Sequence, residues 1–235
     1  MRHLSLALVL AAVLTAGGCG QRTSSLPAAE PLPPQAEVPA ELPLVPETPE
    51  DAAEPEAEEF VLVTERLPQV GVDLRYASDD NFTGQIIYGF TDAYLRYGTV
   101  QKLAQAQAAL EEAGYSLLIW DAFRPVDAQF RLWEVCPDPA YVANPETGFS
   151  SHSRGNTVDV TLADPDGNAV EMPSGFDDFS PLADRDYSDA SPEAAARARL
   201  LEDVMTDCGF RPYSGEWWHF TDTDDYPVEE DFSPG

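Results

Sequence analysis

Residues 150–159 read Ser150-Ser151-His152-Ser153-Arg154-Gly155-Asn156-Thr157-Val158-Asp159, and a second stretch reads Glu216-Trp217-Trp218-His219. The chain contains three histidines, and one of them, His3, stands in an apolar N-terminal segment. His152 and His219 are therefore the imidazoles left for the folded domain, and each lies near a carboxylate. Two imidazoles and Asp159 form a three-ligand set of the kind that leaves a fourth zinc position open in catalytic sites. Glu216 is then left over as a candidate base, and the fold has to bring the two stretches together.

Neither stretch is specific by itself. A histidine seven residues before an aspartate is common, and its usual explanation is a hydrogen-bonded pair in a surface loop. The joint occurrence favours the metal site, because His219 is also three residues from an acid and stands beside two aromatic residues. On a regular strand Glu216 and His219 would face opposite ways, so we expect this segment to be bulged or bent. We expect Trp217 and Trp218 to serve packing.

Composition limits the class of protein. A chain of 235 residues with 43% hydrophobic content has room for one domain with a core. The formal charge of −29 and the single lysine, Lys102, argue against binding to nucleic acid or to anionic lipid headgroups. The same acidity also keeps an exterior protein soluble, and it carries no information about chemistry.

The N-terminus has the features of an export signal. Met1-Arg2-His3 precedes an apolar run from Leu4 to Ala16, which is too short to span a membrane and is followed by small residues. Ala16-Gly17-Gly18-Cys19 resembles a bacterial lipobox, in which the cysteine is acylated, although Ala16 stands where leucine is usual. We expect residues 1–19 to be a signal peptide and Cys19 to tether the exported protein, as a lipoprotein, to the outer face of the cytoplasmic membrane. An ordinary signal with a chance cysteine is the alternative.

Residues 20–59 have the composition of a spacer. They are rich in Pro, Ala and Glu and contain no aromatic residue before Phe60. Such a stretch cannot bury enough apolar surface to fold, and its prolines and like charges keep it extended. We therefore expect a disordered tether over 20–59 and one folded domain over 60–235.

Cys136 and Cys208 are the cysteines of the expected domain. In an exported protein an even number of cysteines permits a disulfide, and two cysteines allow a single pairing. We therefore expect a Cys136–Cys208 bridge. Zinc ligation by these thiols is the weaker alternative, because they lack CxxC spacing and the histidine and carboxylate set is sufficient.

Helices alternate with short strands along the expected domain. Cap and proline signals predict helices from Thr99 to Gly114, from Val126 to about Val135, and from Ser191 to Gly209. Apolar runs predict strands at 60–64, 72–76, 115–120 and 216–220. Hairpin turns and the lack of a regular βαβ period indicate a single α+β domain, with a central antiparallel sheet and flanking helices.

Arg124 follows the strand predicted at 115–120 and stands just before Pro125, at the start of the next helix. This places it on a strand-to-helix turn, where a side chain can point into a cleft. Arg124 is therefore a candidate for contact with a developing oxyanion. A salt bridge to Asp121 or Asp127 explains the same residue equally well.

Four motifs in this order resemble one known family. They are Tyr76-Ala-Ser-Asp-Asp-Asn-Phe-Thr-Gly84, Leu118-Ile-Trp-Asp-Ala-Phe-Arg-Pro125, Ser150-Ser-His-Ser-Arg-Gly155 with Asp159, and Glu216-Trp-Trp-His219. The family is that of the zinc D-alanyl-D-alanine dipeptidases associated with vancomycin resistance and D-Ala-D-Ala catabolism, within the wider zinc D,D-peptidase group. The resemblance covers about residues 60 to 230 and implies a hedgehog/D,D-peptidase-like fold.

The resemblance also implies roles for individual residues. It makes His152, Asp159 and His219 the ligands of one zinc ion per chain. It makes Glu216 the catalytic base and Arg124 the partner of the transition state. Ser150 and Asp177 correspond to substrate contacts, with Asp177 holding the free amino group of a dipeptide.

The activity that the resemblance implies is zinc-dependent hydrolysis of D-Ala-D-Ala. The resistance enzyme acts inside the cell, whereas this chain is expected outside it, so we expect a role in cell-wall peptide turnover or salvage. A D,D- or L,D-carboxypeptidase acting on peptidoglycan stem peptides is the alternative, and Asp177 favours a true dipeptide. A non-catalytic zinc- or wall-binding lipoprotein is a further alternative, against which Glu216 and Arg124 argue.

Overall fold

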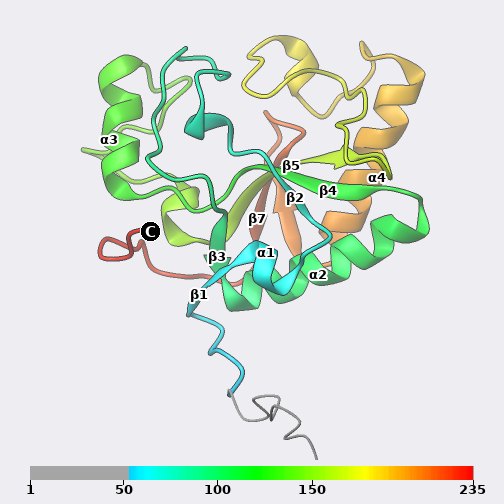
Figure 1. Cartoon of the computed structure of the whole chain (residues 1–235). Helices are drawn as coiled ribbons and strands as arrows, with labels where there is room; N and C mark the ends of the chain where they lie inside the picture. Colours follow the sequence, from blue (N-terminus) through cyan, green and yellow to red (C-terminus); the bar gives the residue numbers. More distant parts are fainter. Residues whose placement is uncertain (1–52, 235) are drawn as a thin grey trace, which may run out of the picture. The chain divides into compact units, whose positions relative to one another are not determined.

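The computed structural model describes residues 53–234 (Figure 1). The elements, in chain order, are β1 (Phe60–Leu62), α1 (Val63–Arg66), β2 (Gly71–Val72), the 3-10 turn η1 (Arg75–Ala77), β3 (Tyr94–Arg96), α2 (Tyr97–Glu112), β4 (Ser116–Asp121), α3 (Val126–Val135), η2 (Ser151–Arg154), β5 (Thr157–Ala163), η3 (Pro181–Ala183), α4 (Pro192–Asp207), β6 (Phe210–Pro212) and β7 (His219–Asp222). The expected signal peptide, Cys19 and residues 20–52 of the expected tether lie outside the described residues.

Within residues 53–234 the strands form a five-stranded sheet of order β2-β4-β5-β7-β6 and a two-stranded sheet of β1 with β3. The pairs from β4 to β6 are antiparallel, and the edge strand β2 runs parallel to β4. The α+β class and the antiparallel character of the central sheet are therefore confirmed, with one parallel edge. The register sets Asp159 of β5 opposite both Asp121 of β4 and His219 of β7.

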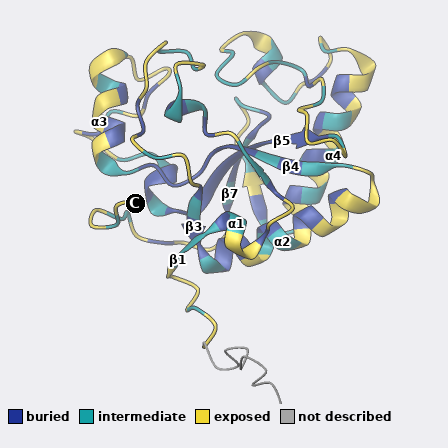
Figure 2. Cartoon of the chain, viewed as in Figure 1, coloured by how far each residue is buried: buried dark blue, intermediate teal, exposed yellow. Residues whose placement is uncertain are grey.

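The core lies between the sheet and the helices α2 and α4, which contact each other and the sheet. Figure 2 shows much of the middle of the central sheet as buried, and α2 and α4 as buried on one face and exposed on the other. All seven residues of β5 are buried, so the central strand is covered on both faces. Trp217 and Trp218 are 0% exposed, which confirms that they serve packing. Within residues 53–234 no helix combines the length and the apolar character needed to cross a membrane.

The helix predictions agree closely with the structure. α3 covers the predicted residues, and α4 begins with the side chain of Ser191 accepting a hydrogen bond from Ala194 N. Gly114 and Gly209, which follow α2 and α4, have φ values of 81° and 91°, as a left-handed helix end requires. α2 differs at its start, because it begins at Tyr97 and not at a Thr99 cap. The Thr99 hydroxyl instead donates to the buried Asp222 carboxylate, at 2.8 Å.

The folded part begins earlier than residue 60. Two backbone carbonyls of the expected tether accept hydrogen bonds from the first N–H groups of α2, Glu59 O from Tyr97 N (2.8 Å) and Ala57 O from Gly98 N (3.0 Å). Glu58 O accepts from the side chain of Arg96, at the end of β3 (Nη1, 2.7 Å). The first N–H groups of a helix have no partner within it. Ala57 and Glu59 supply these partners, so the domain boundary predicted at residue 60 is a few residues too late.

The predicted disulfide is wrong, since Cys136 and Cys208 are both unpaired in the described structure. Cys136 ends α3 and Cys208 ends α4. Figure 1 shows these two helices at opposite sides of the sheet. A disulfide needs Cα atoms within about 7 Å. An even number of cysteines permits a bridge but cannot show whether the fold brings the two thiols together.

Gly155, which ends η2, packs against the ring of Phe60, and a substitution there tests this contact. It has a φ of 73°, and an added methyl group would overlap the ring of Phe60. We expect Gly155→Ala to lower the free energy of unfolding through both strain and overlap. Gly167→Ala is the matched control, because Gly167 has a φ of 84° but open space around it. Overpacking typically costs about 1–3 kcal/mol, so urea unfolding should show Gly155→Ala as the less stable variant by roughly that amount. Equal losses in the two variants would contradict the packing of Phe60 on this turn.

Candidate metal centre

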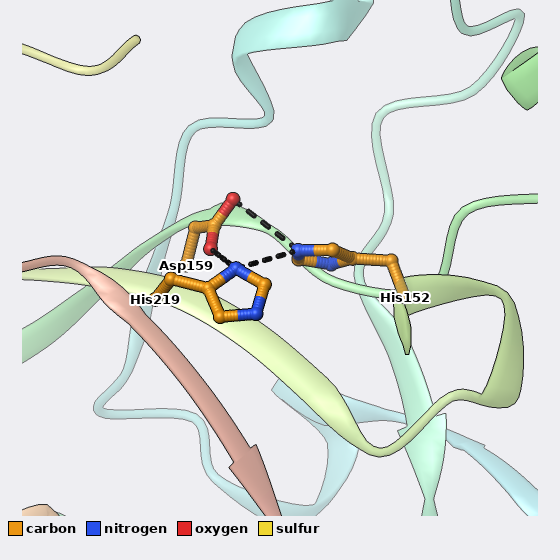
Figure 3. Close-up of side chains that lie close together, drawn as sticks. All are labelled: His152, Asp159 and His219. Atoms are coloured by element: carbon orange, nitrogen blue, oxygen red, sulfur yellow. Dashed lines mark hydrogen bonds and ion pairs between the residues drawn. The ribbon is translucent and has the colours of Figure 1, made fainter. Parts of the chain in front are cut away.

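Three side chains from separate parts of the chain converge at one end of the central sheet (Figure 3). His152 comes from η2, Asp159 from β5 and His219 from the first position of β7. Their nearest atoms are 3.4 Å apart for His152 Nε2 and Asp159 Oδ2, 3.0 Å for His219 Nδ1 and Asp159 Oδ1, and 3.4 Å for His152 Nε2 and His219 Nδ1. One ligand atom from each residue lies within 4.8 Å of the others. The structure therefore brings the three predicted metal ligands together.

The local sequence explains how each ligand reaches this point. The Ser150 hydroxyl accepts a hydrogen bond from His152 N (3.3 Å), which starts the short turn, and Gly155 ends it in the left-handed conformation. Asp159 and His219 face each other because they are register partners on β5 and β7. Two ligands thus depend on strand pairing, and the third depends on a turn of four residues, η2.

Hydrogen bonding assigns the free nitrogen of His152. His152 Nδ1 lies 2.8 Å from the carbonyl oxygen of Ala122. A carbonyl only accepts, so Nδ1 carries the proton and the lone pair of Nε2 faces Asp159 and His219. This arrangement, in which a second partner orients an imidazole, is typical of metal ligands.

Asp159 is buried, and among the described residues no donor is aligned for a hydrogen bond to its Oδ1, although His219 Nδ1 lies 3.0 Å away. Burial raises the pKa of its carboxyl group, but the neighbouring His152 and His219 lower that pKa by more than burial raises it. The net result is a pKa well below the usual range. The group is therefore a carboxylate. An ionised buried oxygen without a hydrogen bond is costly, and a bound cation would remove that cost. The two nitrogen atoms and one oxygen atom are the donor types that zinc takes in catalytic sites.

Glu216 reaches the same place through a turn. His219 N donates to Glu216 O at 3.3 Å, so residues 216–219 bend before β7 begins, and the predicted strand over 216–220 starts only at His219. The bend confirms the expectation that this segment is not a regular strand, and it sets Glu216 Oε2 3.6 Å from His219 Nδ1. Burial, with the nearby charge of Asp159, raises the pKa of Glu216 above its ordinary value.

Arg124 is held on three sides. Its Nη2 donates to Asp121 Oδ2 (2.7 Å), its Nη1 to Gln129 Oε1 (3.1 Å) and its Nε to the hydroxyl of Tyr88 (3.3 Å). The predicted alternative, an ion pair with Asp121, is therefore present, whereas Asp127 pairs with Arg131. A guanidinium group has five N–H donors. Arg124 also lines the cleft, so it combines a fixed position with N–H groups that remain for a substrate.

All seven predicted site residues line one cleft, of about 320 Å³. They are Arg124, Ser150, His152, Asp159, Asp177, Glu216 and His219. Asp177 has a left-handed φ of 54°, which is uncommon for a residue other than glycine and often marks a functional position. Its Oδ2 accepts a hydrogen bond from the Tyr76 hydroxyl at 2.8 Å. Burial, and then the charge of Asp159, raise the pKa of Asp177 to about 8 against the effect of this hydrogen bond.

Comparison with known proteins gives the same family as the four motifs. The model of the D-Ala-D-Ala dipeptidase family, Peptidase_M15, matches residues 56–234. This chain belongs to that family. It is a family of zinc metallopeptidases, and the cofactor is accordingly zinc, for which His152, Asp159 and His219 are the fitting ligands.

Individual relatives agree with the family assignment. The D-alanyl-D-alanine dipeptidase of Escherichia coli is 41% identical over 155 residues, which cover 66% of this chain and 79% of the relative. The D-alanyl-D-alanine dipeptidase of Enterococcus faecalis is 34% identical, over 72% of this chain and 94% of the relative. A solved structure of the vancomycin-resistance D,D-pentapeptidase VanY in complex with Zn(II) is 16% identical over 58% of this chain and 76% of that chain, with a TM-score of 0.39.

Three tyrosines of the dipeptidase cleft were not predicted from the sequence. Tyr76, Tyr141 and Tyr213 line it together with the predicted residues. Tyr76 opens the first of the four motifs, and that position was the only available signal. Tyr141 and Tyr213 stand in loops, where nothing in the local pattern separates a cleft residue from a surface residue.

The ligand set predicts how zinc content depends on single residues. We expect purified His152→Ala to contain far less zinc than the one ion per chain of the unaltered dipeptidase, because a third of its donor set is gone. Glu216→Ala is the matched control, since it removes a carboxylate from the same cleft but not from the ligand set. Atomic absorption would measure both. Full zinc content in His152→Ala, or loss of zinc from Glu216→Ala, would overturn this ligand assignment.

The raised pKa of Asp177 predicts a pH effect on the stability of the zinc-free protein. With an ordinary pKa of 3.8 and a folded-state pKa of about 8, the folded state binds more protons than the unfolded state between these values. The free energy of unfolding should therefore fall as pH rises through this window. Asp177→Asn removes the titration and can still accept from Tyr76, so its stability should depend less on pH there. Urea unfolding in the presence of a chelator measures this difference, and parallel pH curves would contradict it.

Proposed function

We propose that this protein hydrolyses the free dipeptide D-Ala-D-Ala with one zinc ion as cofactor. The observation that carries the proposal is that Asp177 lines the same cleft as the three metal ligands and Glu216. Burial raises the pKa of Asp177 to about 8, and a cation beside it would lower that pKa, so the free α-ammonium group of a dipeptide can pair with Asp177 as a carboxylate. The corresponding nitrogen of a stem peptide is acylated and uncharged, so it cannot form this ion pair with Asp177.

The protein groups divide the work of peptide hydrolysis. When bound, zinc supplies Lewis-acid activation of water and of the scissile carbonyl group. Glu216, partly shielded from water and with a raised pKa, accepts the proton of the attacking water and returns it to the leaving amine. Arg124 directs its remaining N–H groups toward the oxygen that gains negative charge, and such a donor typically contributes about 3 kcal/mol. Ser150 lies in the same cleft, where its hydroxyl can hydrogen-bond the peptide.

The location of this reaction is also proposed to be the cell exterior. The support is the sequence of residues 1–19, with its apolar run and Cys19, followed by the Pro-, Ala- and Glu-rich stretch. A lipid on Cys19 would hold the dipeptidase at the outer face of the cytoplasmic membrane. There its substrate would come from peptides released during cell-wall turnover.

A zinc-binding lipoprotein without catalysis would need neither Glu216 nor Arg124. Both residues line the cleft beside the metal ligands, and Arg124 is held there by three side-chain partners. A set of a base and a fixed cation at a metal centre is what hydrolysis uses. The enzymatic proposal therefore explains residues that simple zinc binding leaves unexplained.

A peptide panel tests the proposal. The zinc-loaded protein should cleave D-Ala-D-Ala with a kcat/KM far above that for L-Ala-L-Ala or for a stem pentapeptide ending in D-Ala-D-Ala. Asp177→Asn should lower kcat/KM for the dipeptide, and so reduce the ratio of kcat/KM for the dipeptide to kcat/KM for the pentapeptide. Preferential release of the terminal D-Ala from the pentapeptide would instead make the protein a carboxypeptidase. Glu216→Ala should reduce kcat by about a hundredfold or more, since general-base assistance is worth roughly 10²–10⁴.

A further inference from the structure

Arg96, the last residue of β3, is buried with 6% of its surface exposed. Its guanidinium donates to the carbonyl of Arg154 from Nε (3.0 Å) and to the carbonyl of Glu58 from Nη1 (2.7 Å). Nη2 lies 3.2 Å from the Glu229 carboxylate, and the backbone N of Arg96 donates to Gly155 O at 2.8 Å. One side chain therefore joins the N-terminal segment, the end of η2 and the C-terminal tail, which we define as residues 225–234.

The C-terminal tail holds η2 from a second direction. Glu229 N donates to the carbonyl of Ser153 at 2.8 Å, and Arg154 Nη1 donates to the carbonyl of Tyr226 at 2.5 Å. Ser153 and Arg154 follow His152 directly in the turn. The residues after the metal ligand are therefore hydrogen-bonded to the tail as well as to Arg96.

Aromatic packing fixes the tail in this place. The ring of Phe232 stacks on Phe60, with centroids 4.3 Å apart, and both rings contact Phe123. The Arg96 guanidinium lies over the Phe60 ring, 4.1 Å from its centroid. Phe123 stands between Ala122, whose carbonyl orients His152, and Arg124, whose N–H donates to the carbonyl of His152 at 3.2 Å. The tail thus supports η2 on its hydrogen-bonded side and the strand end beside it.

We propose that Arg96 and Glu229 are positioning residues that fix His152 for zinc binding. Asp159 and His219 need no such help, because strand pairing sets their places. His152 stands on a turn of four residues, and the nearest strand after it, β5, begins three residues after Arg154. A metal ligand must be held to within about 0.5 Å. Arg96 and the C-terminal tail restrain η2 in this way, because the Arg96 guanidinium binds Glu58, Arg154 and Glu229 at the same time.

Zinc affinity tests this inference, which rests on the metal centre of the proposed function but not on its substrate. The dissociation constant for zinc would be measured on the full chain, by competition with a chelating dye and without peptide. Removing a group that orients a metal ligand typically weakens metal affinity by about 10–100-fold. We expect Arg96→Met to raise the zinc dissociation constant about tenfold or more, and Glu229→Gln to raise it less. A failure of the peptide panel leaves this measurement unaffected.

Gln107→Leu is the matched control for a general loss of stability. Gln107 is 0% exposed on α2, and its side chain accepts a hydrogen bond from Leu117 N at 2.8 Å, away from η2 and the tail. We expect this variant to melt at a lower temperature and to bind zinc like the unaltered protein. Wild-type zinc affinity in Arg96→Met, or equal weakening in Gln107→Leu, would overturn the inference. If Arg96→Met does not fold, unchanged affinity in both Glu229→Gln and Phe232→Ala would overturn it.

Discussion

The pairing of β5 with β7 is the constraint on which the site depends. It sets Asp159 opposite His219, and the pairing of β5 with β4 sets the same aspartate opposite Asp121. Side chains alternate along a strand, so a slip of one residue would turn Asp159 away from the cleft and move buried residues of β5 toward it. The fully buried central strand makes such a slip costly, because Val158 and Val160 would exchange places with polar neighbours. The packing of the core therefore also sets the geometry of the metal centre.

The same register creates an electrostatic problem, because two buried carboxylates stand opposite each other. Asp121 is 0% exposed, and its oxygens are occupied by Arg124, the Tyr88 hydroxyl and the backbone N of Ala122. The charge of Arg124 offsets that of Asp121, and the imidazoles of His152 and His219 face Asp159. A buried charge that loses its partner costs roughly 3–5 kcal/mol. Arg124 therefore has two roles: it stabilises the fold by pairing with Asp121, and it is also a residue of the cleft.

Much of this arrangement could be predicted from the sequence, and the failures have physical reasons. The metal ligands could be predicted because the domain has so few histidines. The helices α3 and α4 could be predicted because Pro125 and Ser191-Pro192 mark their starts. The predicted disulfide was wrong because an even number of cysteines says nothing about their distance, and α3 and α4 lie at opposite sides of the sheet (Figure 1). The boundary at residue 60 failed because residues 57–59 are ordered through backbone carbonyls, which composition does not report. Arg96 gave no signal, since its partners Glu58, Arg154 and Glu229 are distant along the chain.

The guanidinium of Arg96 brings Glu58 and Glu229 to one point, so the chain enters and leaves the folded body at nearly the same place. Domains whose ends meet tolerate circular permutation and insertion into loops of other proteins, because neither rearrangement stretches the core. A linker of a few residues could join the two ends here, and new ends could be opened at an exposed turn such as Asp166-Gly167. This architecture thus lends itself to being carried as a module within a larger protein, provided that the joined ends keep their hydrogen bonds to η2, which carries His152.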